Sequence, residues 1–158
     1  MQAALALVVL VLGMATGCGP SVEVEESLVV YSLDPDFERR PVPGEEWFGN
    51  RFVFGSVSVT DPERRAELLT AVREGIDGAK GQPPLACLFE PRHGLHHVAK
   101  DGTVTDYVIC FKCGEAVVEK NGRRVEGMSQ TTHRPQKLLN DTLRSAGVKL
   151  ASGADKGE

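Results

Sequence analysis

Hydrophobic residues follow three different patterns along this chain. Residues 2–16 carry no charged side chain and are almost all apolar. From residue 28 onward, short or alternating apolar runs of strand type appear, and two later segments repeat apolar residues at intervals of three and four, as helices do. The pattern therefore predicts an apolar leader followed by one domain that mixes strands and helices.

Strands are predicted where short apolar runs end at turn residues. These runs cover residues 28–33, 51–60, 85–89, 95–99, 104–110, 116–119 and 123–127. The pairs Asp101-Gly102 and Asn121-Gly122 separate neighbouring runs and are typical of two-residue hairpin turns. The closely spaced runs from residue 85 onward therefore predict an antiparallel meander.

Two helices are predicted by apolar residues at helical spacing and by the residues that bound them. The first begins near Pro62, which suits a first helical turn, and ends at Gly78. The second covers residues 135–146, and Gly147 after it suits the left-handed position of a Schellman motif. The expected fold class is α+β, an antiparallel β-meander with two helices packed on one face.

Composition narrows the range of functions. The chain has 158 residues, of which 41% are hydrophobic and 25% charged, as in a folded single domain rather than a disordered chain. Its 18 Lys and Arg against 22 Asp and Glu give a net charge of −4, which disfavours nucleic acid as a partner. The sequence contains no phosphate-binding glycine loop and no hydrolase motif, so no catalytic residue is predicted and an enzyme is disfavoured.

The first 18 residues resemble a bacterial lipoprotein signal. As a helix, the apolar run would span only ~20 Å, which is short for a ~30 Å hydrocarbon core. It leads into Ala-Thr-Gly-Cys18, which is similar to a lipobox. This resemblance implies cleavage after residue 17 and attachment of a diacylglycerol to the thiol of Cys18. The alternative is an ordinary secretory signal in which Cys18 has no role.

The expected organisation follows from this leader. Residues 1–17 form a signal peptide, residues 18–27 the lipidated cysteine and an acidic tether, residues 28–150 a single α+β domain, and residues 151–158 a flexible tail. The partner implied is a membrane, contacted through the lipid anchor. The expected location is the bacterial cell membrane or outer membrane, facing the periplasm or the exterior. The sequence names no protein partner.

Two cysteine-containing segments stand out in the domain. One reads Cys87-Leu-Phe-Glu-Pro-Arg-His-Gly94, and the other reads Ile109-Cys-Phe-Lys-Cys113. Together they resemble uncharacterised bacterial exported proteins with a Cys-Phe-x-Pro-Arg-His-Gly segment followed by Ile-Cys-Phe-x-Cys, although Leu88 is an extra residue here. The resemblance implies one intact domain and supplies no mechanism.

The chemistry of these segments has several possible forms. The first is a tetrahedral zinc site with three thiolates and one imidazole. Its four candidate ligands are Cys87, His93, Cys110 and Cys113. The second is a structural disulfide, in which Cys87 bonds Cys110 or Cys113, or those two bond each other. A redox dithiol at Cys110 and Cys113 and a set of inert buried thiols are the remaining alternatives.

Two functions from different classes follow from these alternatives. The first is a lipid-anchored binding or structural module of the cell envelope with a disulfide or zinc site. The second is an envelope thiol oxidoreductase that uses the Cys110-x-x-Cys113 pair. A redox pair of this type needs a helix start that lowers the pKa of the first thiol. The sequence instead places the pair between two strands, which favours the module.

Overall fold

The computed structural model describes residues 24–83, 85–125, 127 and 129–155, so the predicted signal peptide and Cys18 lie outside the described residues. In chain order the elements are β1 (Ser27–Leu33), β2 (Trp47–Phe48), β3 (Arg51–Ser58), α1 (Pro62–Gly78), β4 (His93–Val98), β5 (Val104–Cys110), β6 (Glu115–Lys120), β7 (Arg123–Arg124), β8 (Ser129–Gln130) and α2 (Gln136–Ser145). The predicted α+β class with a β-meander and two helices is confirmed.

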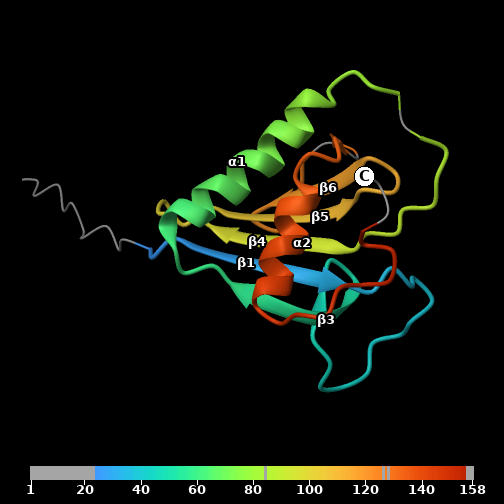
Figure 1. Ribbon diagram of the computed structural model, residues 1–158, viewed down its shortest axis with the longest axis horizontal. Coiled ribbons are helices and arrows are strands. Elements are labelled where there is room, and N and C mark those ends of the chain that lie inside the picture. The colour runs from blue at the N-terminus through green and yellow to red at the C-terminus, as the bar shows by residue number, and fades with distance from the viewer. Residues whose placement is uncertain (1–23, 84, 126, 128, 156–158) are drawn as a thin grey trace, which may run out of the picture.

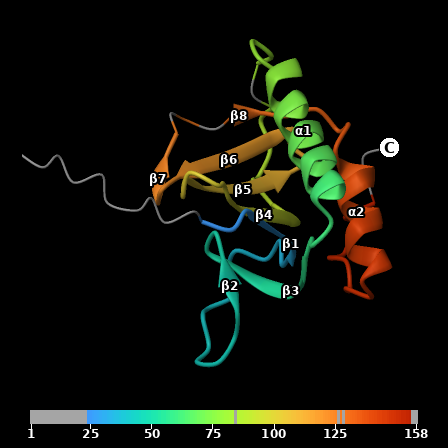
Figure 2. The same cartoon turned by 90° about the vertical axis from the view of Figure 1, so that its left-hand side faces the viewer.

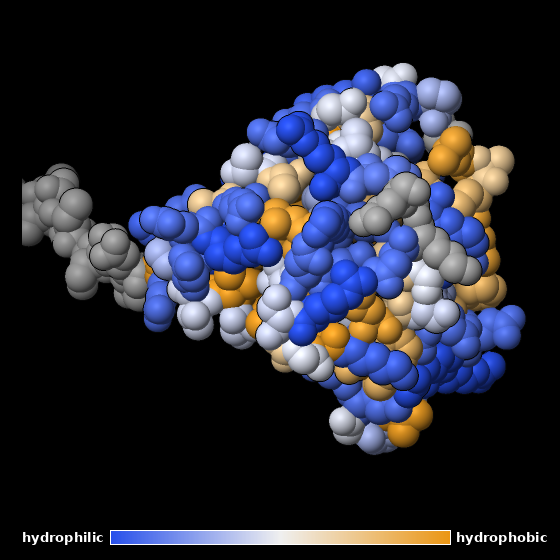
Figure 3. All heavy atoms as spheres, viewed as in Figure 1, coloured by the Kyte–Doolittle hydropathy of each residue, from blue (hydrophilic) through white to orange (hydrophobic). Residues whose placement is uncertain are grey.

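The strands form one antiparallel sheet in the order β2-β3-β1-β4-β5-β6-β7, and β8 also pairs with β6. Strands β4, β5, β6 and β7 follow one another as a meander, whereas β1 lies between β3 and β4. Both helices lie on the same face of this sheet (Figures 1 and 2). Polar and charged residues cover most of the outer surface on that side (Figure 3).

The main core lies between the sheet and the two helices. Its fully buried side chains come from β1, α1, β4, β5 and α2, and they include Leu28, Val30, Leu68, Val72, Leu95, Ile109, Leu139 and Leu143. Burial of each such side chain stabilises the fold by ~1.5–3 kcal/mol. The core therefore fixes the helices against the middle of the sheet, where β1, β4 and β5 lie side by side.

A second, smaller cluster lies on the opposite face of the sheet. It contains Leu33, Val53, Val108 and Val117, which the long connection between β1 and β3 helps to cover. Phe48 of this connection packs against the cluster, and a Cβ atom at Gly94 would lie only 2.6 Å from its ring. The middle of the sheet is therefore buried on both faces, and β4 needs a glycine where the aromatic ring crosses it.

The two hairpin turns differ from each other. At Asn121-Gly122 the prediction is confirmed, because both residues have positive φ (50° and 71°) and the strand residues on either side are paired. The prediction of a two-residue turn at Asp101-Gly102 is wrong. Ala99 donates its N–H to the carbonyl of Thr103 at 2.9 Å, so the loop has three residues and only its glycine, with φ 79°, is left-handed.

Two of the predicted strands are also corrected. Residues 85–89 form no strand. Leu85 and Leu88 are instead more than half exposed. The strand predicted at residues 123–127 is reduced to the two residues of β7.

The ends of the helices follow the predicted chemistry. Asp61 caps α1, accepting hydrogen bonds from the backbone N–H groups of Glu63 at 2.8 Å and Arg64 at 3.4 Å. After α2, Val148 donates its N–H to the carbonyl of Leu143 at 3.0 Å, which completes the predicted Schellman motif. Within the part of the chain that the structure describes, no helix is long and apolar enough to cross a membrane.

The two-residue turn at Asn121-Gly122 provides a test of the meander. Gly122→Val forces a β-branched residue into a left-handed conformation, which costs ~1–2 kcal/mol and should lower the melting temperature by several degrees. Gly122→Asn is the matched control, because Asn tolerates positive φ, and it should lose clearly less stability. Equal melting temperatures for the two variants would contradict the turn.

Candidate functional site

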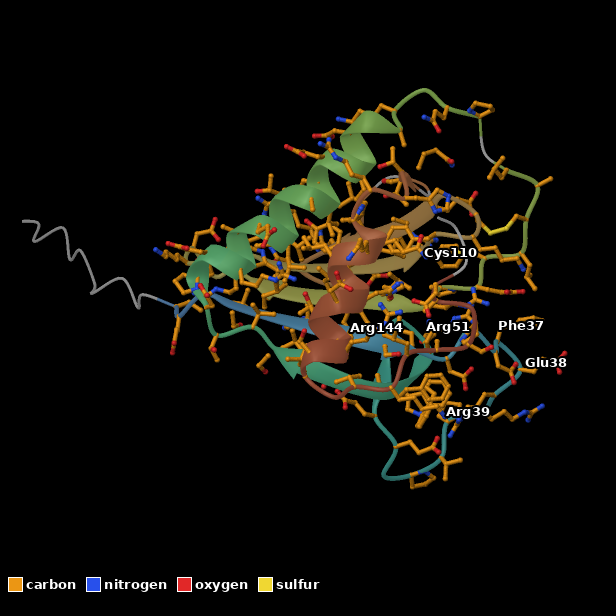
Figure 4. The ribbon with its side chains drawn as sticks, viewed as in Figure 1. Phe37, Glu38, Arg39, Arg51, Cys110 and Arg144 are labelled. Carbon is orange, nitrogen blue, oxygen red and sulfur yellow. A yellow bond between two sulfur atoms is a disulfide. The ribbon has the colours of Figure 1, made fainter. Side chains whose placement is uncertain are left out.

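The structure contains a disulfide between Cys87 and Cys113, with Cα atoms 5.7 Å apart and a sequence separation of 26 residues. The bond, drawn in yellow in Figure 4, ties the irregular segment before β4 to the turn between β5 and β6. Closing a loop of this length in the unfolded chain is worth roughly 3–4 kcal/mol. Of the pairings that the sequence left open, the structure has this one.

Cys110 is a free thiol and is completely buried at the end of β5. By strand alternation it shares the face of Val108, away from the helices. Arg51 lies beside this region (Figure 4) and donates to the carbonyl oxygens of Pro35 at 3.1 Å and Phe89 at 3.2 Å. Desolvation lowers the pKa of Arg51 below its usual value, although neighbouring acidic groups oppose this effect. Arg51 therefore connects the loop after β1 to the segment before β4.

The four predicted zinc ligands are not brought together as a set. Two of them, Cys87 and Cys113, are bonded to each other, and His93 lies on the helical face of β4. Among the described residues, no group of three or more His, Cys, Asp or Glu side chains is placed to hold a metal ion. The arrangement is that of a structural disulfide with a separate buried thiol.

The Cys110-x-x-Cys113 segment also lacks the features of a redox dithiol. Cys113 is bonded to Cys87 rather than to Cys110. The segment forms a tight turn between β5 and β6, in which Gly114 donates its N–H to the carbonyl of Phe111 at 3.2 Å. No helix begins here, so no helix N-terminus is available to stabilise a thiolate.

His93 forms a buried polar contact between the sheet and α2. Its side chain is 1% exposed, its Nε2 atom lies 2.7 Å from Oδ1 of Asn140, and the Phe111 ring packs edge-on at 5.2 Å. The Asn140 amide nitrogen donates to the carbonyl of Ala154 at 3.1 Å, so its oxygen is the acceptor and His93 Nε2 carries the hydrogen. Burial lowers the pKa of His93 to about 4, which keeps the ring neutral.

Residues 151–155, which are expected to belong to a flexible tail, are packed against the domain instead. They turn back along the helical side of the sheet after α2 (Figure 1) and pack on the domain. The backbone N–H of Ala151 donates to the hydroxyl of Ser32 at 3.1 Å, and the Gln136 amide donates to the carbonyl of Ala154 at 2.6 Å. The small and polar residues of this segment gave no apolar pattern. The missed signal was the pair of amides four residues apart on α2, Gln136 and Asn140, which are both buried.

Arg92 connects the same segment to the cysteine-containing loop. Its Nε atom donates to the carbonyl of Ser152 at 2.7 Å, and its other nitrogens contact the backbone carbonyl and carboxylate of Glu90. Lys112 donates to the same carboxylate at 3.0 Å, and this hydrogen bond, with the one from Arg92, lowers the pKa of Glu90. Glu90 therefore fixes the orientation of the Arg92 guanidinium, which binds the 151–155 segment through Ser152.

A surface pocket of about 740 Å³ lies away from the cysteines, along the connection between β1 and β3. Trp47 lines it together with Arg39 and Glu45, which form an ion pair at 2.6 Å. None of the site residues predicted from the sequence contributes to this pocket.

Comparisons of the chain with family models, with curated proteins and with solved structures found no match. The geometry of the described residues is therefore the basis for any functional conclusion.

The neutral, buried His93 predicts a dependence of stability on pH. Between a pKa of ~6.5 in the unfolded chain and about 4 in the folded chain, only the unfolded state binds a proton at this residue. Stability should therefore be complete above pH 6.5 and fall by about 3 kcal/mol as the pH drops towards 4. Urea unfolding at pH 7 and pH 4.5 measures most of this loss.

A variant comparison isolates the contribution of His93 from that of the carboxylates. His93→Gln should show a smaller loss between the two pH values, whereas His133→Ala, which removes an exposed histidine, should keep the loss of the unmodified chain. If His93→Gln does not fold, an NMR titration of the intact protein should find the His93 ring neutral at pH 5.5. A charged ring at that pH would contradict the buried geometry.

Proposed function

We propose that this chain is a lipid-anchored protein of the bacterial cell envelope whose domain serves as a binding or structural module. The observation that carries this proposal is the disulfide between Cys87 and Cys113. Disulfides persist in oxidising compartments such as the periplasm and the cell surface, and are rare in the cytosol. This agrees with the leader, whose sequence resembles a lipoprotein signal.

The engagement of the candidate chemical groups supports a module rather than an enzyme. The cations Arg92 and Lys112 both contact Glu90, and the imidazole of His93 is enclosed beneath α2. Cys110 is buried without a neighbouring helix start. The side chains of Arg92, Lys112 and His93 therefore make contacts within the domain, and the thiol of Cys110 is enclosed.

The proposed anchor also restricts where the domain can be. A diacylglycerol with a further acyl chain exceeds the two-signal threshold for stable membrane attachment. β1 begins at Ser27, nine residues after Cys18 along the chain, and an extended chain over that span reaches ~30 Å. The domain would thus remain close to the membrane surface.

Fractionation of a bacterial host tests the anchor. The unmodified chain should be recovered with membranes, and Cys18→Ser should block processing or move the protein to the soluble fraction. Ser21→Ala is the matched control, because it alters the same tether and leaves the cysteine in place, so it should stay with the membranes. Recovery of the unmodified chain entirely as soluble periplasmic protein would rule out the anchor.

Thiol counting with metal analysis tests the disulfide. In the Cys18→Ser chain, denatured without reductant, one thiol should react, and three should react after reduction, because Cys87 and Cys113 are bonded and Cys110 is free. Peptide mapping should recover residues 87 and 113 in one cross-linked fragment. Three reactive thiols together with one zinc per chain would instead establish the metal site.

A further inference from the structure

Residues 151–155 are held in the way that a bound peptide is held. Three side chains of the domain donate to backbone carbonyls of the segment: Arg92 to Ser152 at 2.7 Å, Gln136 to Ala154 at 2.6 Å and Asn140 to Ala154 at 3.1 Å. Contacts to backbone oxygens do not depend on the side chain of the residue that is bound. A peptide from another chain with the same backbone path would accept the same hydrogen bonds.

The segment also meets specific requirements for residue size and conformation. Ala151 and Ala154 are 4% and 2% exposed, so only small side chains fit at these positions. Gly153 has a φ of 76°, and a Cβ atom there would lie 3.5 Å from the guanidinium of Arg92. The segment therefore has a glycine in the left-handed conformation, with an enclosed small residue two positions before it and another directly after it.

An acidic residue completes the recognition. The carboxylate of Asp155 forms an ion pair with Arg144 of α2, a residue labelled in Figure 4, and accepts a hydrogen bond from Asn140 at 3.2 Å. Charge-assisted hydrogen bonds of this kind are stronger than those between neutral groups. The bound pattern is therefore a small residue, any residue, glycine, a small residue and an acidic residue.

The receiving side chains have partners that do not belong to the segment. Asn140 is oriented by His93, and Arg92 is oriented by Glu90. Gln136 contacts Nδ1 of His133 through its amide oxygen at 3.1 Å. These contacts preorganise the donors, so their orientation would persist after the segment has left, and preorganisation lowers the cost of binding a new ligand.

We propose that these side chains form a peptide-binding site that residues 151–155 occupy in cis, and that a peptide of a partner protein with the same small-x-Gly-small-acidic chemistry competes for it. The inference deepens the binding-module proposal by naming the kind of ligand. It does not depend on the anchor, because binding is measured in solution.

Because residues 151–155 of the same chain occupy the site, they reduce its apparent affinity for an external peptide. A segment tethered to its own site acts at a high effective concentration, so a free peptide must compete against it. If the segment is bound in nine of ten molecules or more, the apparent affinity for an external peptide is reduced about tenfold or more. A change that weakens the segment should therefore strengthen binding of an external peptide.

Fluorescence anisotropy with a labelled synthetic peptide of residues 149–158 tests this relation on the full-length Cys18→Ser chain. Gly153→Val in the chain should release the segment, because valine strongly disfavours the positive φ of this position. The affinity for the unmodified peptide should then rise by about tenfold or more. Adding Asn140→Ala to this chain should abolish the gain, and a peptide that itself carries Gly153→Val should bind weakly to every chain.

Several results would overturn the proposal. One is the absence of peptide binding to the Gly153→Val chain when hydrogen exchange shows that residues 151–155 have been released. If that variant does not fold, Asp155→Asn, which removes only the ion pair with Arg144, should give a smaller gain in the same direction, and no gain would count against the site. A dimer of the unmodified chain with exchanged segments would assign the site to a second copy instead of a partner. Failure of the fractionation or thiol tests would leave these measurements unaffected.

Discussion

The hydrogen bond between His93 and Asn140 joins three parts of the domain that are distant in sequence. It links the first residue of β4 to the buried side of α2, and the other end of the Asn140 amide reaches the carbonyl of Ala154. Because the site is enclosed, burial lowers the pKa of His93 to about 4, although the hydrogen bond to Asn140 opposes this shift. The next residue, Gly94, provides the space that Phe48 needs on the opposite face. The position of both layers thus depends on two adjacent residues at the start of β4.

The disulfide holds in place a segment that does not belong to the sheet. Residues 85–92 precede β4 and form no strand of their own, although the backbone of Arg92 is hydrogen-bonded to Leu33 and Ile109. The bond from Cys87 to Cys113 and the hydrogen bond from Arg51 to the carbonyl of Phe89 also hold this segment against the domain. A segment fixed in this way keeps Arg92 in position to contact Ser152. The cysteine chemistry therefore supports the geometry around residues 151–155 even though no cysteine touches that segment in the contacts described.

The parts of this structure that the sequence predicted are those that depend on local chemistry. Pro62 at the start of α1, Gly147 after α2 and the Asn121-Gly122 turn each favour one local conformation, and the three predictions based on them were correct. The insertion of β1 between β3 and β4 depends on long-range pairing, which no local pattern encodes. The choice of Cys113 over Cys110 as the partner of Cys87 also follows from the fold, because β5 buries one thiol and the following turn presents the other. Alanine, serine and glycine at 151–154 gave no apolar signal, since side-chain donors on α2 and near β4 bind their backbone rather than their side chains.

The position of the 151–155 segment relative to the tether bears on what could reach it. β1 begins at Ser27 beside the tether, and Ser32 near its other end accepts the N–H of Ala151. Ser32 is five residues after Ser27 along the extended strand, a distance of ~17 Å. Figure 1 shows the described start of the chain and the segment after α2 at opposite ends of the domain. If the chain is anchored through Cys18 as proposed, the segment lies on the end of the domain that is farther from the point of attachment. A peptide on an extracytoplasmic partner would then reach Arg92, Gln136 and Asn140 without having to pass between the domain and the membrane.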